Sequence, residues 1–190
     1  HPIMEVMELG KGMDLNVGLD HVAAGRCMAD HLLDKGYRHI VYVGARLSQD
    51  YRASMRYEGH KAVLKEKGID APLLELDTLG SLQAGAEGLA QVLAQYPHTQ
   101  AIHFANDDLA AGALLAAQRQ GLKVPGDIAI AGFNGLPLGQ HVTPQLTTIL
   151  SPREEMGRLA AKELIRRLSG KNVYRRQHDV GFKLQIGGST

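Results

Sequence analysis

Short apolar segments with strand character alternate with amphipathic helical segments along most of this 190-residue sequence. The loops between them are short, and glycine ends most of the helical segments, as it commonly does. Because each parallel strand has to be reached through a crossover, such alternation favours a parallel sheet with helices on both faces. The sequence therefore predicts an α/β protein with a parallel doubly wound sheet. The expected strands are 38–43, 71–76, 101–104 and 127–133, and the helices between them are 52–67, 82–96 and 107–120.

Both ends of the chain depart from this alternation. Two short strand-like segments precede a helix that Asp20 is placed to cap. Near the other end, residues 151–154 (Ser-Pro-Arg-Glu) have the pattern of a capping box with proline at the first helical position, which predicts the start of a helix. The expected end segments are strands at 2–7, 15–19, 145–150 and 180–186 and helices at 21–35 and 152–168.

Composition excludes several classes of protein. With 21 basic and 20 acidic residues the net charge is +1, so the chain lacks the general basic character of a nucleic-acid-binding domain. No apolar run approaches the roughly 20 residues that a membrane helix needs, and we expect no membrane partner. A single cysteine, Cys27, excludes a disulfide framework and fits a reducing compartment, so we expect a cytoplasmic protein. Because the sequence begins at His1 without a signal pattern, we expect it to start inside a longer gene product.

The sequence contains no recognised catalytic or cofactor motif. It lacks G-x-S-x-G, C-x-x-C, H-E-x-x-H and the phosphate loop G-x-x-x-x-G-K-[ST]. The glycines at 85 and 88 fall inside a predicted helix, whereas a dinucleotide fingerprint follows a strand. The nine histidines are scattered without metal-ligand spacing. We therefore expect no enzyme activity, no cofactor and no metal.

The run 101–112 joins a predicted buried strand to a helix through an Ala-Asn-Asp corner. Asn106 is placed to cap the helix, and Asp107 and Asp108 add favourable charges to its first turn. In a parallel sheet such a corner lies at the carboxyl end of a strand, where ligands collect. The residues alone leave two interpretations of Asn106 open: a purely structural cap, or a contact to a polar small molecule.

Arginine and asparagine side chains follow four of the predicted strands. Since the carboxyl ends of parallel strands meet at one edge of the sheet, we expect these side chains to line one cleft. A guanidinium group binds a carboxylate through two hydrogen bonds, and amides bind hydroxyl groups, so the set predicts a hydroxylated anion as ligand. The alternative of exposed arginines paired with acidic neighbours or water stays open. The side chains are Arg52, Arg56, Asn106, Asn134 and Arg153.

Five motifs keep a common order and spacing across nearly the whole chain. They are YRHIVYVG (37–44), RYEGH (56–60), ANDDLAAGA (105–113), VPGDIAIAGF (124–133) and PQLTTI (144–149). In this arrangement the chain resembles the LacI family of bacterial repressors. Within that family, segments 131–136 and 151–153 look most like the gluconate-utilisation repressors.

The resemblance implies a two-lobed fold, similar to periplasmic sugar-binding proteins, with an effector held between the lobes. Residues 1–14 are then a remnant of the N-terminal lobe, and 15–141 form the C-terminal lobe. Residues 142–190 provide the crossover, a helix and a closing strand that returns to the N-terminal lobe, most of which is absent. The helix-turn-helix that binds operator DNA belongs to a headpiece outside this chain.

The resemblance also implies roles for single residues. Arg56 and Asn106 match effector-binding positions of the family, while Asn134 falls where the family usually has an acidic residue. Losing that negative charge suits an anionic effector such as a sugar acid, and Arg153 adds positive charge in the same direction. The expected effector-binding set is completed by Arg52 and Ser151. A helix that resembles the family's dimer helix carries the expected homodimer contacts Leu109, Ala113 and Leu114.

The function expected from these observations is the effector-binding and dimerisation region of a LacI-type transcriptional regulator that senses a sugar acid such as gluconate. Effector binding changes the balance between two states and so changes operator binding. A periplasmic sugar-binding protein shares the fold and is the alternative, which an upstream signal peptide in place of a helix-turn-helix would indicate. A sugar-phosphate or nucleotide enzyme is disfavoured by the missing phosphate loop.

Overall fold

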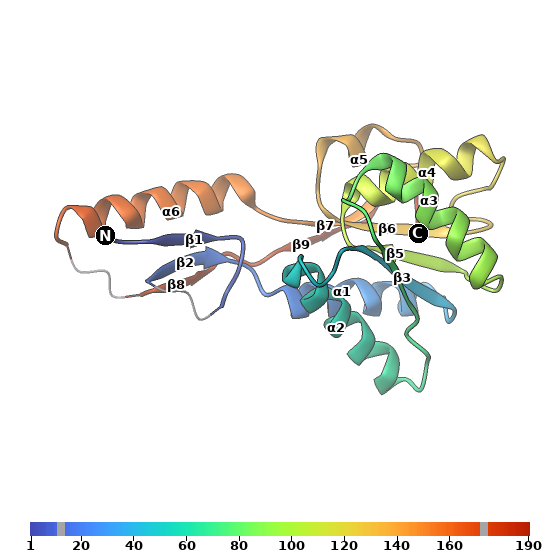
Figure 1. Ribbon diagram of the computed structural model, residues 1–190, viewed down its shortest axis with the longest axis horizontal. Coiled ribbons are helices and arrows are strands. Elements are labelled where there is room, and N and C mark those ends of the chain that lie inside the picture. Colours follow the sequence, from blue (N-terminus) through green and yellow to red (C-terminus); the bar gives the residue numbers. More distant parts are fainter. Residues whose placement is uncertain (11–13, 172–174) are drawn as a thin grey trace. The chain divides into compact units, whose positions relative to one another are not determined.

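The computed structural model describes residues 1–10, 14–171 and 175–190. The chain forms two compact units (Figure 1). The small unit consists of residues 1–21 and 151–183, and the large unit of residues 22–150 and 184–190.

The small unit is a three-stranded parallel sheet with one long helix. Its strands are β1 (Met4–Val6), β2 (Leu15–Gly18) and β8 (Gln177–Asp179), in the order β1-β2-β8. Helix α6 (Arg153–Leu168) packs on β1 and β2 through its buried apolar positions, which include Met156 and Ala160.

The large unit contains the predicted doubly wound sheet. Its strand order is β4-β3-β5-β6-β7-β9, and the first five of these strands are parallel. Because β4 and β5 lie on opposite sides of β3, the winding direction reverses between β3 and β5, which makes this position a topological switch point. The strands are β3 (Ile40–Ala45), β4 (Leu73–Leu76), β5 (Ala101–Phe104), β6 (Ala129–Asn134), β7 (Thr147–Leu150) and β9 (Lys183–Gln185).

Helices cover both faces of this sheet. On one face α3 and α4 pack with their backbones in direct contact. A Cβ atom added to Gly112 would lie only 2.0 Å from the carbonyl oxygen of Leu82, and a Cβ atom added to Gly85 would lie 2.0 Å from the carbonyl oxygen of Leu109. On the other face α1 and α2 cross equally closely at Gly25. Only glycine permits such backbone contacts. The helices are α1 (His21–Asp34), α2 (Tyr51–Glu66), α3 (Leu82–Gln95), α4 (Asp107–Arg119) and the short α5 (Pro137–His141).

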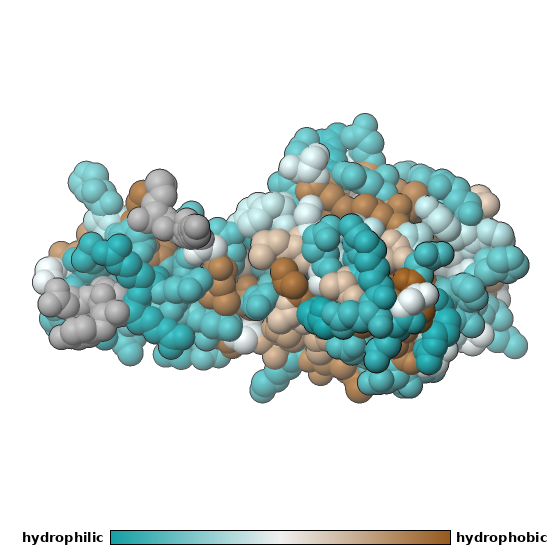
Figure 2. Space-filling model, turned by 90° about the horizontal axis from the view of Figure 1, so that it is seen from below, coloured by the Kyte–Doolittle hydropathy of each residue, from teal (hydrophilic) through white to brown (hydrophobic). Residues whose placement is uncertain are grey.

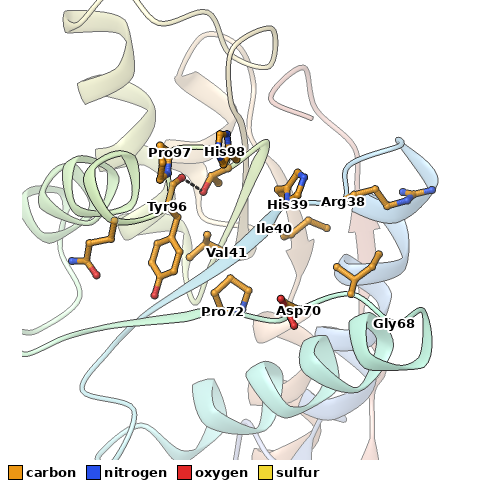
Figure 3. Close-up of a pocket in the computed structure, with 13 residues that line it drawn as sticks. Arg38, His39, Ile40, Val41, Gly68, Asp70, Pro72, Tyr96, Pro97 and His98 are labelled. Carbon is orange, nitrogen blue, oxygen red and sulfur yellow. Dashed lines mark hydrogen bonds between the residues drawn. The ribbon is translucent and has the colours of Figure 1, made fainter.

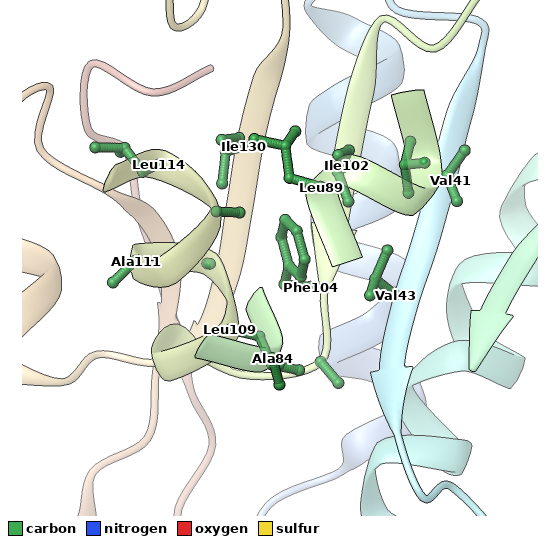
Figure 4. Packing of buried hydrophobic residues seen from close by; sticks show 14 of the residues in the cluster. Val41, Val43, Ala84, Leu89, Ile102, Phe104, Leu109, Ala111, Leu114 and Ile130 are labelled. Carbon is green, nitrogen blue, oxygen red and sulfur yellow. The ribbon is translucent and has the colours of Figure 1, made fainter. Parts of the chain in front are cut away.

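The main core lies between the sheet and the α3–α4 pair. Phe104 and Leu89 are at its centre, with Val41 and Val43 of the neighbouring strand beside them (Figure 4). Tyr42 points to the opposite face and packs on α2, as the alternation of side chains along a strand requires.

Most residues of helix α4 are buried within the chain itself. The expected dimer contacts Leu109, Ala113 and Leu114 are each 0% exposed and belong to this core. Their apolar spacing arises because α3 covers one side of α4 and the sheet covers another. These three side chains therefore offer no exposed surface to a second chain. The contacts of the expected homodimer have to come from other residues.

Two expectations for the C-terminal segment need correction. The strand that returns to the small unit is β8, whereas β9, inside the expected closing strand 180–186, extends the large sheet. The expected capping box does not form, because the N-cap position of α6 is Pro152, one residue after Ser151, and has no side-chain cap bond. The Arg153 amide instead donates to the Ser151 carbonyl oxygen at 2.8 Å.

On the face shown in Figure 2, hydrophilic residues are interspersed with apolar patches. Among the described residues, none of the helices has both the length and the apolar character of a membrane span.

Candidate functional site

A cleft of about 350 Å³ opens at the carboxyl ends of β3, β4 and β5. Two of the predicted ligand residues, Arg52 and Asn106, line it together with the unpredicted Arg46 and Asp50. Gly80 and Ala105 leave the space between these polar groups open. The cleft therefore lies at the switch point of the large sheet, where ligands of this fold class bind.

Asn106 is a helix cap, and its geometry also places it in the cleft. Its side-chain oxygen accepts a hydrogen bond from the Leu109 amide at 2.9 Å, and its backbone is extended as an N-cap requires. A Cβ atom added to Gly80 would lie 2.8 Å from the Asn106 side-chain nitrogen. The cap uses the oxygen, so the nitrogen faces the part of the cleft that glycine keeps open.

The rim of the cleft carries two guanidinium groups. Arg46 follows β3 directly, has a left-handed backbone with φ of 42°, and lies 3.5 Å from the Asp77 carboxylate in an exposed ion pair. Arg52 is half-buried in the first turn of α2, which Asp50 caps by accepting from the Ala53 amide at 3.0 Å. Arg46, like the predicted Arg52, follows the carboxyl end of β3, so its position in the sequence was a signal for this site as well.

Arg56 lies below the cleft and is not a solvated arginine. It is 4% exposed, its Nη2 donates to the Ala105 carbonyl oxygen at 3.0 Å, and its guanidinium lies 3.9 Å from the centre of the Phe133 ring. Burial lowers the pKa of Arg56, and interactions with Tyr42 and Asp50 oppose that shift. A buried positive charge thus stands behind the wall that Ala105 contributes.

Asp107 is a buried hydrogen-bond acceptor, although the sequence indicated only a first-turn charge. It is 0% exposed, and its two oxygens accept from the Thr148 hydroxyl and the Leu136 amide, each at 2.6 Å. Burial raises the pKa of Asp107, and the hydrogen bonds from Thr148 and Leu136 oppose this shift. A Cβ atom at Gly132 would lie 2.4 Å from Asp107 Oδ1, so glycine is required there. Asp107 joins α4 to β7 and to the loop after β6.

That loop carries Asn134, which ends β6 with a left-handed φ of 118°. Asn134 is half-buried and follows Phe133, whose ring contacts Arg56. The predicted residues Ser151 and Arg153 belong to the small unit, where Ser151 is buried and Arg153 is exposed. The large unit thus holds four of the predicted side chains, and convergence of all six stays a prediction.

A larger cavity of about 570 Å³ opens at the opposite edge of the sheet (Figure 3). Val41, Pro72 and Tyr96 give it a mainly apolar lining. The Arg38 guanidinium at its rim donates to the carbonyl oxygens of Leu33 and Tyr37. None of the predicted ligand residues lines this cavity, and it lies away from the carboxyl ends of the strands.

Comparison with known proteins identifies the family. Residues 29–190 match the periplasmic binding protein-like domain. The crystal structure of the transcription regulator GntR from Chromobacterium violaceum matches with a TM-score of 0.94 at 36% identity, over 99% of this chain and 69% of that one. A LacI family transcriptional regulator from Enterococcus faecium with bound ribose matches with a TM-score of 0.89 at 25% identity, over 100% of this chain and 70% of that one. The chain belongs to the LacI family.

The relatives found by sequence comparison are also named as transcriptional regulators. The HTH-type transcriptional regulator GntR of Pseudomonas aeruginosa is 42% identical over 192 residues, which is 100% of this chain and 55% of that protein. The chain thus spans about half the length of the curated relatives it matches. These relatives are named as transcriptional regulators and not as enzymes.

Proposed function

We propose that this LacI-family chain is the effector-binding region of a cytoplasmic, homodimeric transcriptional regulator that senses a small sugar acid such as gluconate. Effector binding changes operator affinity through a separate N-terminal helix-turn-helix. The observation that carries the proposal is the cleft at the switch point of the sheet, where Arg46, Arg52 and Asn106 meet above the buried Arg56.

The chemistry of this cleft fits a hydroxylated anion. A guanidinium at the rim binds a carboxylate through two parallel hydrogen bonds, and Arg52 is available for this geometry in the first turn of α2. The Asn106 amide nitrogen donates to a hydroxyl group, and the Asp50 carboxylate accepts from one. Buried positive charge at Arg56 favours an anion further. The ribose-bound relative supports a polyhydroxylated ligand on this fold.

Titration calorimetry on the full-length protein tests the ligand class. Gluconate, its 6-phosphate, glucose and a purine are compared under one buffer condition. We expect gluconate to bind more tightly than glucose, which matches it in size and hydroxyl groups and lacks the carboxylate. A neutral sugar that binds best refutes the sugar-acid assignment.

Substitution of Arg56 tests the site itself. Because Arg56 is buried, Arg56→Ala is expected to weaken gluconate binding by about 2–4 kcal/mol. The matched control is Arg26→Ala, which removes an exposed guanidinium that pairs with Glu66 at 2.9 Å on the outside of the same unit. Equal affinity in the Arg56 and Arg26 variants contradicts a role for Arg56 in binding.

The regulatory part of the proposal needs a separate readout. Fluorescence anisotropy of the full-length protein on its operator, with and without the effector, measures whether ligand binding changes DNA affinity. Light scattering measures whether the protein is a dimer. Ligand binding without any operator binding favours the periplasmic alternative.

A further inference from the structure

Two histidines are buried between α2 and the centre of the large sheet. His60 of α2 and His103 of β5 are 0% and 1% exposed, and their Nδ1 atoms lie 3.2 Å apart. The two rings meet edge to face with centroids 5.1 Å apart. Tyr42 of β3 completes the cluster, with its ring centroid 5.5 Å from that of His60 and 4.8 Å from that of His103.

The hydrogen bond of this pair requires one Nδ1 atom to donate and the other to accept. Burial lowers the pKa of His60 to about 3, and burial, His60 and Arg56 together hold the pKa of His103 well below its usual range. The groups that face the pair are Arg56 from α2 and Tyr42 from β3. Both imidazoles are therefore neutral at physiological pH.

Packing alone does not explain histidine at position 60. Within the described part of the chain, the buried Nε2 atom of His60 has no hydrogen-bond partner. A buried polar atom without a partner is unfavourable, so an apolar side chain would be more stable there if filling space were the only requirement. What His60 provides beyond volume is a directional bond to His103.

That bond lies next to the contact that holds Arg56. His60 and Arg56 are four residues apart, so they lie one turn apart on the same face of α2. His103 lies in β5, and Ala105, which directly follows the end of β5, accepts the hydrogen bond of Arg56. Helix α2 is therefore joined to β5 by the histidine pair and to the residue directly after β5 by the Arg56–Ala105 bond.

We propose that His60 and His103 are positioning residues for Arg56, because their hydrogen bond fixes α2 on the sheet so that the guanidinium stays over Phe133 and beneath the cleft. Rotation or sliding of α2 moves both contacts together, since both lie on one face of one helix. The inference rests on the proposed function, in which Arg56 favours the anionic effector.

The test compares His60→Leu with His31→Leu in the full-length protein. His31 is the matched control because it is also buried in the large unit, at 8% exposed, and its Nε2 is hydrogen-bonded to the Thr190 hydroxyl at 2.9 Å. We expect His60→Leu to weaken gluconate binding about tenfold and to accelerate solvent exchange of the Arg56 Nε proton in ¹⁵N NMR. His31→Leu leaves both quantities unchanged.

A conservative variant separates positioning from packing. The side-chain amide of asparagine places a polar atom where the histidine Nδ1 lies, so His60→Asn is expected to keep gluconate affinity within about threefold of wild type. Equal affinity in His60→Leu and wild type, or equal losses in His60→Leu and His31→Leu, overturns the inference. If wild type binds no gluconate, the proposed function fails, and the Arg56 Nε exchange rate still decides the positioning role because it needs no effector.

Discussion

Asp107 holds the loop after β6 in place, and its replacement by alanine is expected to lower the free energy of unfolding by about 2–4 kcal/mol. The variant removes both acceptors at once and leaves the Leu136 amide and the Thr148 hydroxyl without their present partner. Each buried donor left in this way costs about 1–3 kcal/mol, and the rotating hydroxyl of Thr148 recovers part of the loss.

Asp107→Asn is the informative comparison. Its amide oxygen is able to accept from the Leu136 amide, and its nitrogen is able to donate to the Thr148 oxygen, so both contacts survive. We expect this variant to lose less than about 1.5 kcal/mol at pH 7, because it also avoids burying a charge. Urea unfolding of the full-length protein, followed by circular dichroism, measures both variants.

The pH dependence of the free energy of unfolding tests the burial of Asp107 directly. Burial raises the pKa of Asp107 in the folded state above its unfolded value, so the folded state binds this proton more tightly. Stability from this group is therefore fully present below the unfolded pKa and is lost as pH rises through the folded pKa. Since asparagine does not titrate, the stability gap between wild type and Asp107→Asn should be widest at acid pH. A gap that is constant with pH, or an alanine variant as stable as wild type, refutes this account of Asp107.

Two further predictions concern stability. Because the pKa values of His60 and His103 are lowered in the folded state, the stability that the two histidines contribute is fully present above pH 6.5. As the pH falls further, the free energy of unfolding decreases by up to about 1.4 kcal/mol per pH unit for each histidine. His60→Leu should reduce this slope in urea unfolding between pH 5 and 7, and an unchanged slope contradicts the assignment. Gly112→Ala should lower the free energy of unfolding by about 3 kcal/mol or more, because its Cβ would meet the Leu82 carbonyl oxygen. In Gly157→Ala in α6 the added Cβ meets nothing within 4 Å, so this variant should raise the free energy of unfolding by up to about 1 kcal/mol. Thermal unfolding measures both variants.

The sequence pattern was sufficient to predict the helices α2 to α4 and the strands β3 to β6 of the large unit. The helical and strand periodicities of the sequence correspond to these elements, and the cap at Asn106 follows from its residue type and position. The position of Arg52 after a strand end was sufficient to predict that it lies at this edge of the sheet, and Arg46 has the same kind of position.

What the pattern misses depends on which segments meet in space. An apolar stripe on α4 shows that something covers Leu109 and Leu114, and only the structure shows that α3 and the sheet do so. The burial of Asp107 depends on Thr148, which is 41 residues away along the chain. His60 and His103 pair across 43 residues, and a lone histidine in an apolar segment does not indicate its partner.

The reciprocal glycine contacts between α3 and α4 have a mechanical consequence for the cleft. Where two backbones touch directly, no flexible side chain lies between them to absorb movement. The segment before α3, which carries Gly80, therefore moves as one body with the start of α4, which carries Asn106. Adjustment of the cleft to ligands of different size then falls to the loop 46–50 before α2, which carries Arg46.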